Sequence, residues 1–252
     1  MSGAAGAVAI ATLGSSVSAK TPEKTPDSTA AACVSLTPEL TEGPYYIDDM
    51  LLRDDITEGR EGIPLDLSIT VIDSVSCEPL ADAAVDIWHC DALGDYSGIS
   101  NQAGNDDTAG ETWMRGIQLT GENGVANIQT IYPGWYVGRC THIHLKVHQG
   151  GTAGDGTYIG GTTAHTGQLF FDDELTDSVA QLEPYSQRLD VARTRNEEDG
   201  VLNGQLDAPG FLITVEPVDA RDLSLGFTGS VTIGVDPSAE SSEGPGNPPP
   251  GN

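Results

Sequence analysis

The residues best suited to metal chemistry lie in one short stretch, where two histidines flank an isoleucine. His142 and His144 belong to the alternating segment 142–148. If this segment is a strand, alternate side chains point to one face, so both imidazoles can bind a single metal ion. Imidazole is the commonest metal ligand in proteins. A polar patch on an exposed strand is the alternative, but these are two of only five histidines, which favours the metal site.

Other donors lie on either side of this pair. His148 shares the face and competes as a third ligand, but it is expected to lie too far along the strand, which rises about 3.3 Å per residue. Tyr136 precedes the pair in the irregular stretch YPGWYVGR, residues 132–139. Its proline and glycines prevent a regular strand and can turn side chains toward the histidines. Tyrosinate oxygen combined with imidazole suits Fe(III) better than Zn(II) or Cu(I).

The elements that must position these side chains follow a period of two. Strands are expected at 65–73, 83–89, 114–120, 125–131, 142–148, 168–171, 211–218 and 229–236. Short strands separated by turn residues predict an all-β fold, an antiparallel β-sandwich or barrel. The sequence GENG between the third and fourth of these segments predicts a β-hairpin. A short helix capped by Asp172 or Asp173 is expected after Phe171, and a short second helical turn is expected to follow through Arg195.

Composition limits the partners of this chain. Its 252 residues suit one domain with tails, and 11 Lys and Arg against 38 Asp and Glu give a net charge of −27. Such a charge repels nucleic-acid phosphates and anionic membranes, so neither is expected as a partner.

The chain ends differ in composition from the centre. Residues 1–19 are small and apolar and are expected to be a signal or leader segment, with a cleavage-like Val17-Ser18-Ala19. Residues 20–32 predict a flexible linker, and 237–252 a disordered tail rich in Pro, Gly and Ser. The folded domain is therefore expected at 33–236, and the protein is expected to be secreted.

Three segments together resemble the intradiol ring-cleavage dioxygenases. Residues 131–144, IYPGWYVGRCTHIH, are similar to the metal region of that family. Residues 85–97, VDIWHCDALGDYS, resemble its first ligand region, and 41–46, TEGPYY, resemble a segment near its start. The three occur in the family order, and the resemblance extends over about 36–235. The short interval before the first histidine and the absence of a helical N-terminal region resemble the secreted branch.

This resemblance implies a site and a reaction. The implied Fe(III) ligands are Tyr96, Tyr136, His142 and His144. Arg139 is implied to lie beside the substrate, Tyr136 to help accept a proton, and Gln168 to match a downstream glutamine at a different spacing. The implied reaction is cleavage of a catechol by O₂ between its two hydroxyl-bearing carbons, which gives a muconate-type diacid. A homo-oligomer is compatible with this assignment.

Alternatives exist for several of these assignments. The chain could be a non-catalytic, prealbumin-like binding or structural module, or its histidines could hold zinc or copper. Arg139 could serve only in a salt bridge. His89 is expected to be a hydrogen-bonded core residue, and His165 a surface residue in a Gly/Thr-rich loop.

The four cysteines, at 33, 77, 90 and 140, form no CxxC pair. An even number in an exported chain permits two disulfides, with three possible pairings. Cys90 and Cys140 flank the two ligand regions, which suggests that they pair and that Cys33 pairs with Cys77.

Overall fold

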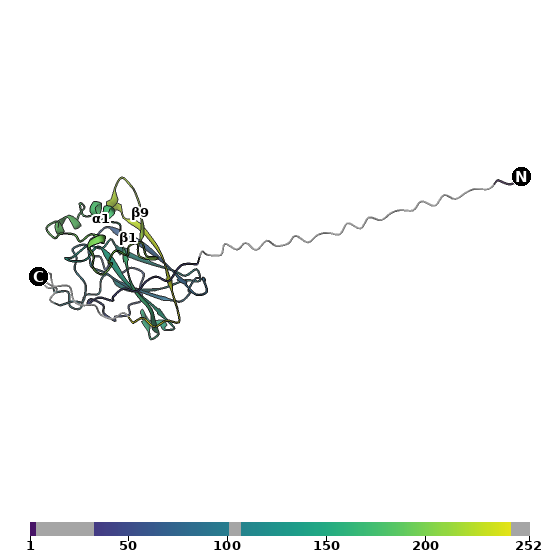
Figure 1. Cartoon of the computed structure of the whole chain (residues 1–252), viewed down its shortest axis with the longest axis horizontal. Coiled ribbons are helices and arrows are strands. Elements are labelled where there is room, and N and C mark those ends of the chain that lie inside the picture. The colour runs from purple at the N-terminus through teal and green to yellow at the C-terminus, as the bar shows by residue number, and fades with distance from the viewer. Residues whose placement is uncertain (4–32, 101–106, 243–252) are drawn as a thin grey trace. The chain divides into compact units, whose positions relative to one another are not determined.

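The computed structural model describes residues 1–3, 33–100 and 107–242 (Figure 1). The chain divides into two units, Met1–Ala30 and Ala31–Asn252, and every described helix and strand belongs to the second. The expected linker, most of the expected leader and residues 243–252 of the expected tail lie outside the described residues.

Two four-stranded sheets form the folded unit. The first has the order β4-β1-β10-β9, with β1 Pro64–Asp73, β4 Val125–Ile131, β9 Thr214–Pro217 and β10 Phe227–Val235. The second has the order β3-β2-β5-β8, with β2 Ala84–Trp88, β3 Arg115–Leu119, β5 His142–Gln149 and β8 Thr162–Phe170. A separate hairpin joins β6 Thr152–Gly154 to β7 Thr157–Ile159. The predicted all-β sandwich is confirmed.

The hydrophobic core lies between the two sheets. Leu67 and Ile69 of β1 belong to the same buried cluster as Ile143 and Leu145 of β5. Burial of each such side chain stabilises the fold by roughly 1.5–3 kcal/mol. Because side chains alternate along β5, its histidines must point to the other face of the second sheet. The core thereby fixes the direction in which the candidate ligands project.

The predicted hairpin is wrong, although its turn forms. The N–H of Gly121 donates to the carbonyl of Val125 at 3.0 Å, yet β3 pairs with β2 while β4 pairs with β1. The turn therefore carries the chain from one sheet to the other. One pair also departs from the antiparallel pattern, since β1 and β10 run parallel. Local alternation defines which face of a strand is apolar but leaves its neighbours open.

The helix expected after Phe171 is confirmed. Helix α1 spans Asp173–Val179, and the Asp172 carboxylate caps it by accepting from the N–H groups of Glu174 and Leu175. Short 3-10 turns occur at Tyr185–Arg188, Asn196–Glu198 and Leu223–Leu225. None of the helices in the described part of the chain has the length and apolar character needed to cross a bilayer.

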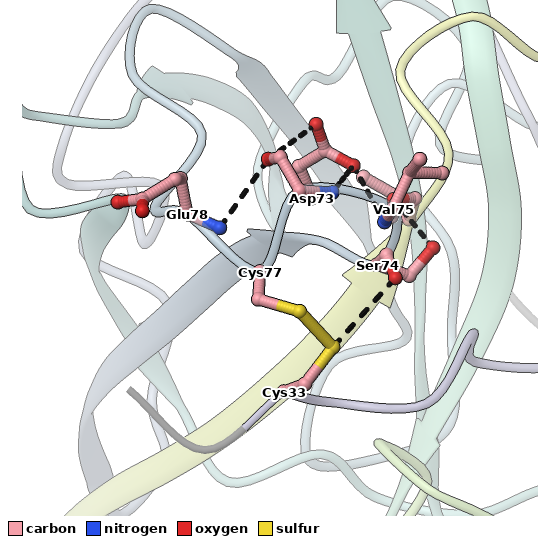
Figure 2. Close-up of a disulfide and its surroundings, with 8 residues drawn as sticks. Cys33, Asp73, Ser74, Val75, Cys77 and Glu78 are labelled. Atoms are coloured by element: carbon pink, nitrogen blue, oxygen red, sulfur yellow. Dashed lines mark hydrogen bonds between the residues drawn. A yellow bond between two sulfur atoms is a disulfide. The ribbon is translucent and has the colours of Figure 1, made fainter. Parts of the chain in front are cut away.

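Only one of the two suggested disulfides is present (Figure 2). Cys33 is bonded to Cys77 in the turn after β1, as suggested. The Cys90–Cys140 bond is wrong, because both residues are buried free thiols. Cys90 packs in an aromatic cluster with Tyr96, whereas Cys140 packs in a separate cluster with Phe170. The two cysteines therefore lie in different hydrophobic clusters and do not pair.

Candidate metal centre and active site

His142 and His144 converge at the beginning of β5. Their Nε2 atoms are 3.1 Å apart, and the two residues are 2% and 1% exposed. The Nδ1 of His142 lies 2.6 Å from the carbonyl oxygen of Cys140. Because a carbonyl only accepts, this Nδ1 must carry the proton, which leaves the Nε2 lone pair directed toward His144. A fixed tautomer of this kind is typical of a histidine that binds a metal.

Both candidate tyrosines lie beside the histidines. The Oη of Tyr136 is 3.3 Å from Nε2 of His142. Tyr96 comes from the loop after β2, and its ring centroid lies 5.8 Å from that of Tyr136 and 6.2 Å from that of His144. The fold therefore brings together four rings from two distant segments, which are the four residues expected as ligands.

Burial favours the neutral form of each of these four groups. It raises the pKa of Tyr96 and of Tyr136 above the ordinary value, although Arg139 opposes the increase at Tyr136. It also lowers the pKa of His142 and His144, and the positive charge of Arg139 adds to that effect. Neutral imidazoles present lone pairs, but buried phenols ionise only beside a strong positive charge.

This donor set fits Fe(III). Two phenolates would balance two of its three positive charges, and two neutral imidazoles would complete a mixed nitrogen and oxygen set. The geometry supports the fit, because Nε2 of His144 lies 3.1 Å from Nε2 of His142 and both atoms are close enough to share one ion. No group of three His, Cys, Asp or Glu able to hold a metal occurs in the described part of the chain, so a metal centre here depends on the tyrosines.

Residues 39–46, which we call the strap, cover the outer face of the second sheet. Gly43 in the strap has φ +77°, and a Cβ atom there would lie 3.0 Å from Cε1 of His144. Trp88 stacks on the ring of His144, with centroids 5.0 Å apart. Tyr45 stacks on Tyr96 at 4.6 Å. The strap and Trp88 therefore confine the ring of His144.

Polar contacts hold the strap in place. Glu42 pairs with Lys146 of β5 at 2.5 Å. Tyr46 donates to the Asp86 carboxylate at 3.1 Å, and the ammonium of Lys146 lies 4.0 Å from the centroid of the Tyr46 ring. The side chain of Gln168 donates to the carbonyl of Thr41 at 2.8 Å. The sequence TEGPYY was noted for its resemblance alone, and its role as a cover could not be inferred without the fold.

Arg139 forms the salt bridge considered for it and also lies beside His142. Its Nε donates to the Asp199 carboxylate at 2.9 Å, so the salt bridge exists. Its Nη2 donates to the side-chain oxygen of Gln168, and its Nη1 lies 3.4 Å from Nε2 of His142. The structure thus places Arg139 and Gln168 at the candidate site. It also adds Asp199, which lies 60 positions further along the chain and carries no sequence signal for this role.

The remaining histidines lie apart from the candidate ligands. His148 contacts Asp86 at 3.4 Å and Thr163 at 3.1 Å. His89 is a core residue, as expected, with its ring nitrogens bonded to Cys90 and Thr130. The surface assignment of His165 is wrong, because it is 1% exposed within β8. The Gly/Thr-rich segment around His165 forms strand β8. Leu40 of the strap and Ser241 each donate a backbone hydrogen bond to this strand.

Comparison with known proteins agrees with this architecture. A family model described as Dioxygenase matches residues 41–149, which include all four candidate ligands. The structure is similar to an intradiol ring-cleavage dioxygenase from Tetranychus urticae, with 32% identity, a TM-score of 0.70, and coverage of 83% of this chain and 98% of that one. The β-sandwich fold, the candidate site and these two matches together define the class of protein as an intradiol ring-cleavage dioxygenase. The chain belongs to this family of enzymes.

Two further solved structures share the fold. The dioxygenase domain of a dioxygenase–carbohydrate-binding fusion from Streptomyces sp. SirexAA-E has 27% identity and a TM-score of 0.54, with 80% of this chain and 99% of that one covered. The 3-chlorocatechol 1,2-dioxygenase of Rhodococcus opacus 1CP has 21% identity and a TM-score of 0.53, with 82% and 75% covered, and supports the fold alone. No curated protein sequence matches the chain.

Proposed function

We propose that this enzyme uses Fe(III), held by Tyr96, Tyr136, His142 and His144, to cleave a catechol-type ring with O₂. The product is a muconate-type diacid. The observation that carries the proposal is the convergence of Tyr136 Oη, His142 Nε2 and His144 Nε2, with neighbouring atoms 3.1–3.3 Å apart. Two imidazole nitrogens and a phenol oxygen that converge in one buried place can bind a single cation, and this ligand set suits iron.

The substrate class is proposed from the character of the site. Tyr45, Tyr96 and Tyr136 present aromatic rings around the donor atoms, and such rings pack well against a planar ring. The similar protein from Rhodococcus opacus 1CP is named for 3-chlorocatechol. We therefore propose a catechol as substrate.

Three residues of the site are proposed to take part in the reaction beside the metal. Bound Fe(III) supplies Lewis acidity that lowers the pKa of the catechol hydroxyls. Tyr136, whose pKa burial raises in the absence of a metal, would accept a proton at Oη. Arg139 stabilises negative charge that develops on the substrate. Gln168 accepts from Nη2 of Arg139 and keeps the guanidinium turned toward the site.

Metal content and oxygen consumption test the proposal together. Purified protein is expected to hold about one iron per chain and to show a visible tyrosinate absorption band. A panel of catechol, protocatechuate and hydroxyquinol should give O₂ uptake with at least one member, and the product should retain both hydroxyl-bearing carbons as carboxyl groups. Stoichiometric zinc without iron, or no uptake across the panel by iron-loaded protein, would contradict the proposal.

We also propose that the protein is secreted. The Cys33–Cys77 bond supports this, because disulfides persist in oxidising compartments. Mass spectrometry of protein from the culture medium should show a mature N-terminus near Lys20. Retention of the full chain inside the cells would contradict secretion.

A further inference from the structure

We propose that Asp199 is a positioning residue that orients both Arg139 and His142 for the reaction. The inference rests on the proposed function and deepens it, since it assigns a role to a residue outside the expected ligand set. Asp199 follows the 3-10 turn Asn196–Glu198 and its side chain is 0% exposed.

Four N–H groups donate hydrogen bonds to the carboxylate of Asp199. Oδ1 accepts from the N–H groups of Val201 and Leu202 at 2.8 and 3.0 Å. Oδ2 accepts from Nε of Arg139 at 2.9 Å and from the N–H of Cys140 at 2.8 Å. A carboxylate fixed at both oxygens cannot rotate without losing these bonds, so Oδ2 is a rigid anchor.

This anchor determines the orientation of the guanidinium. The guanidinium is planar, so two fixed nitrogens define where the third one points. Asp199 holds Nε, and Gln168 holds Nη2 through its side-chain oxygen. The remaining nitrogen, Nη1, then faces the site, 3.4 Å from Nε2 of His142. Without Asp199 the side chain keeps one anchor and can swing away.

The same oxygen reaches the first histidine through the backbone. Asp199 accepts from the N–H of Cys140, and the carbonyl oxygen of Cys140 lies 2.6 Å from Nδ1 of His142. Two groups at the site therefore depend on one carboxylate. Loss of this positioning should therefore lower the rate of the reaction while the iron content stays nearly unchanged.

The first experiment compares Asp199→Asn with Asp177→Asn. Asp177 pairs with Arg193 and Arg195 away from the site, so it provides the same chemical change at another acid–arginine pair. Asp199→Asn is expected to keep iron and the visible band while kcat falls about 10- to 100-fold and KM changes less. Asp177→Asn is expected to match the parent enzyme. Unchanged turnover in Asp199→Asn would overturn the proposal.

A second measurement needs no activity. In metal-free protein, the ¹H–¹⁵N signal of the Arg139 Nε–H group should be sharp and protected from exchange, and it should broaden or disappear in Asp199→Asn. Assignment follows from its absence in Arg139→Ala. If the signal is unaltered in Asp199→Asn, the carboxylate does not fix the side chain. This measurement can be made even if iron-loaded parent enzyme shows no O₂ uptake. The positioning role of Asp199 and the proposed function can therefore be contradicted independently of each other.

A double variant separates positioning from general stabilisation. Arg139→Ala alone should cost on the order of 10²–10³ in turnover. Because Asp199 is proposed to act partly through Arg139, adding Asp199→Asn to Arg139→Ala should cost less than Asp199→Asn costs alone. Multiplication of the two separate losses would show that Asp199 does not act through Arg139 and would overturn the proposal. If Asp199→Asn fails to fold, Arg139→Lys replaces it: this variant keeps the charge without the fork, and full activity would show that orientation is not needed.

Discussion

Tyr136 and His142 place a phenol oxygen 3.3 Å from an imidazole nitrogen in a site whose four candidate donors are neutral when no cation is present. This neutrality has a physical consequence. Burial opposes ionisation of both tyrosines, so a cation must supply the energy that forms the phenolates. A trivalent ion does so more effectively than a divalent one because the attraction increases with charge.

Replacing either tyrosine should therefore alter the colour of the iron-loaded protein. Tyr96→Phe and Tyr136→Phe each remove one phenolate and should each shift or weaken the visible band, with a large loss of turnover. Visible spectra at equal iron content provide the measurement. His148→Ala is the control, since His148 contacts Asp86 and Thr163 instead of the candidate ligands. Parent spectra and full activity in both tyrosine variants would refute the ligand assignment.

His165 should make stability depend on pH. Burial lowers its pKa to about 4, although Glu39 opposes the decrease. The unfolded chain binds a proton below about pH 6.5 while the folded chain does not, so the stability contributed by neutral His165 is present above pH 6.5 and is lost as the pH falls toward 4. Urea unfolding at pH 7 and 5 should show the advantage over His165→Gln shrinking by on the order of 1–2 kcal/mol. A pH-independent difference would contradict this expectation.

At the scale of elements, β5 and the strap act together. β5 directs both histidines away from the core, and the strap covers them from outside. Gly43 allows the closest approach, because any side chain there would lie against the ring of His144. The strap is held at Glu42, Tyr46 and Thr41, so it has little freedom to retreat.

Gly43→Ala should therefore weaken iron binding. The positive φ of +77° costs about 1–2 kcal/mol for any side chain, and the new Cβ also displaces the ring of His144. Iron per chain and the visible band are the measurements. Gly59→Ala is a matched control, because Gly59 has φ +76° with open space around it. It should lose similar stability but keep its iron. Equal iron content in the two variants would show that the strap does not confine His144.

At the scale of the whole molecule, the Cys33–Cys77 bond ties the start of the folded unit to the turn after β1 (Figure 2). It closes a loop with a sequence separation of 44. Residues 34–38 connect this bond to the strap. Thr37 in this segment donates a backbone bond to β10, and Leu40 in the strap donates one to β8. The bond therefore adds a covalent anchor to the chain segment that leads into the strap.

Thiol counting and unfolding test the bond. Denatured protein that has not been reduced should show two reactive thiols, Cys90 and Cys140, and reduction should increase the number to four. Cys33→Ser should lower the free energy of unfolding by roughly 3–4 kcal/mol, as expected for a loop of this length. Cys90→Ser provides a control that leaves the bond intact. Four reactive thiols before reduction would contradict the pairing.

Local patterns in the sequence determined much of this protein. Alternation along 142–148 placed His142 and His144 on one face, because side-chain direction in a strand depends only on position. The cap of α1 at Asp172 followed from local backbone chemistry. The motif order from TEGPYY to THIH was enough to indicate the family. Each of these depends on residues that are close in the chain.

Tertiary structure decided which segments that are distant in the sequence contact one another. It sent β3 and β4 into different sheets, left Cys90 and Cys140 unbonded, and buried His165. It also brought Asp199 to Arg139 across 60 positions. The physical reason is that a strand's alternation or a carboxylate's charge can be satisfied by many partners. Only the simultaneous packing of both sheets, the strap and the loops selects one of them.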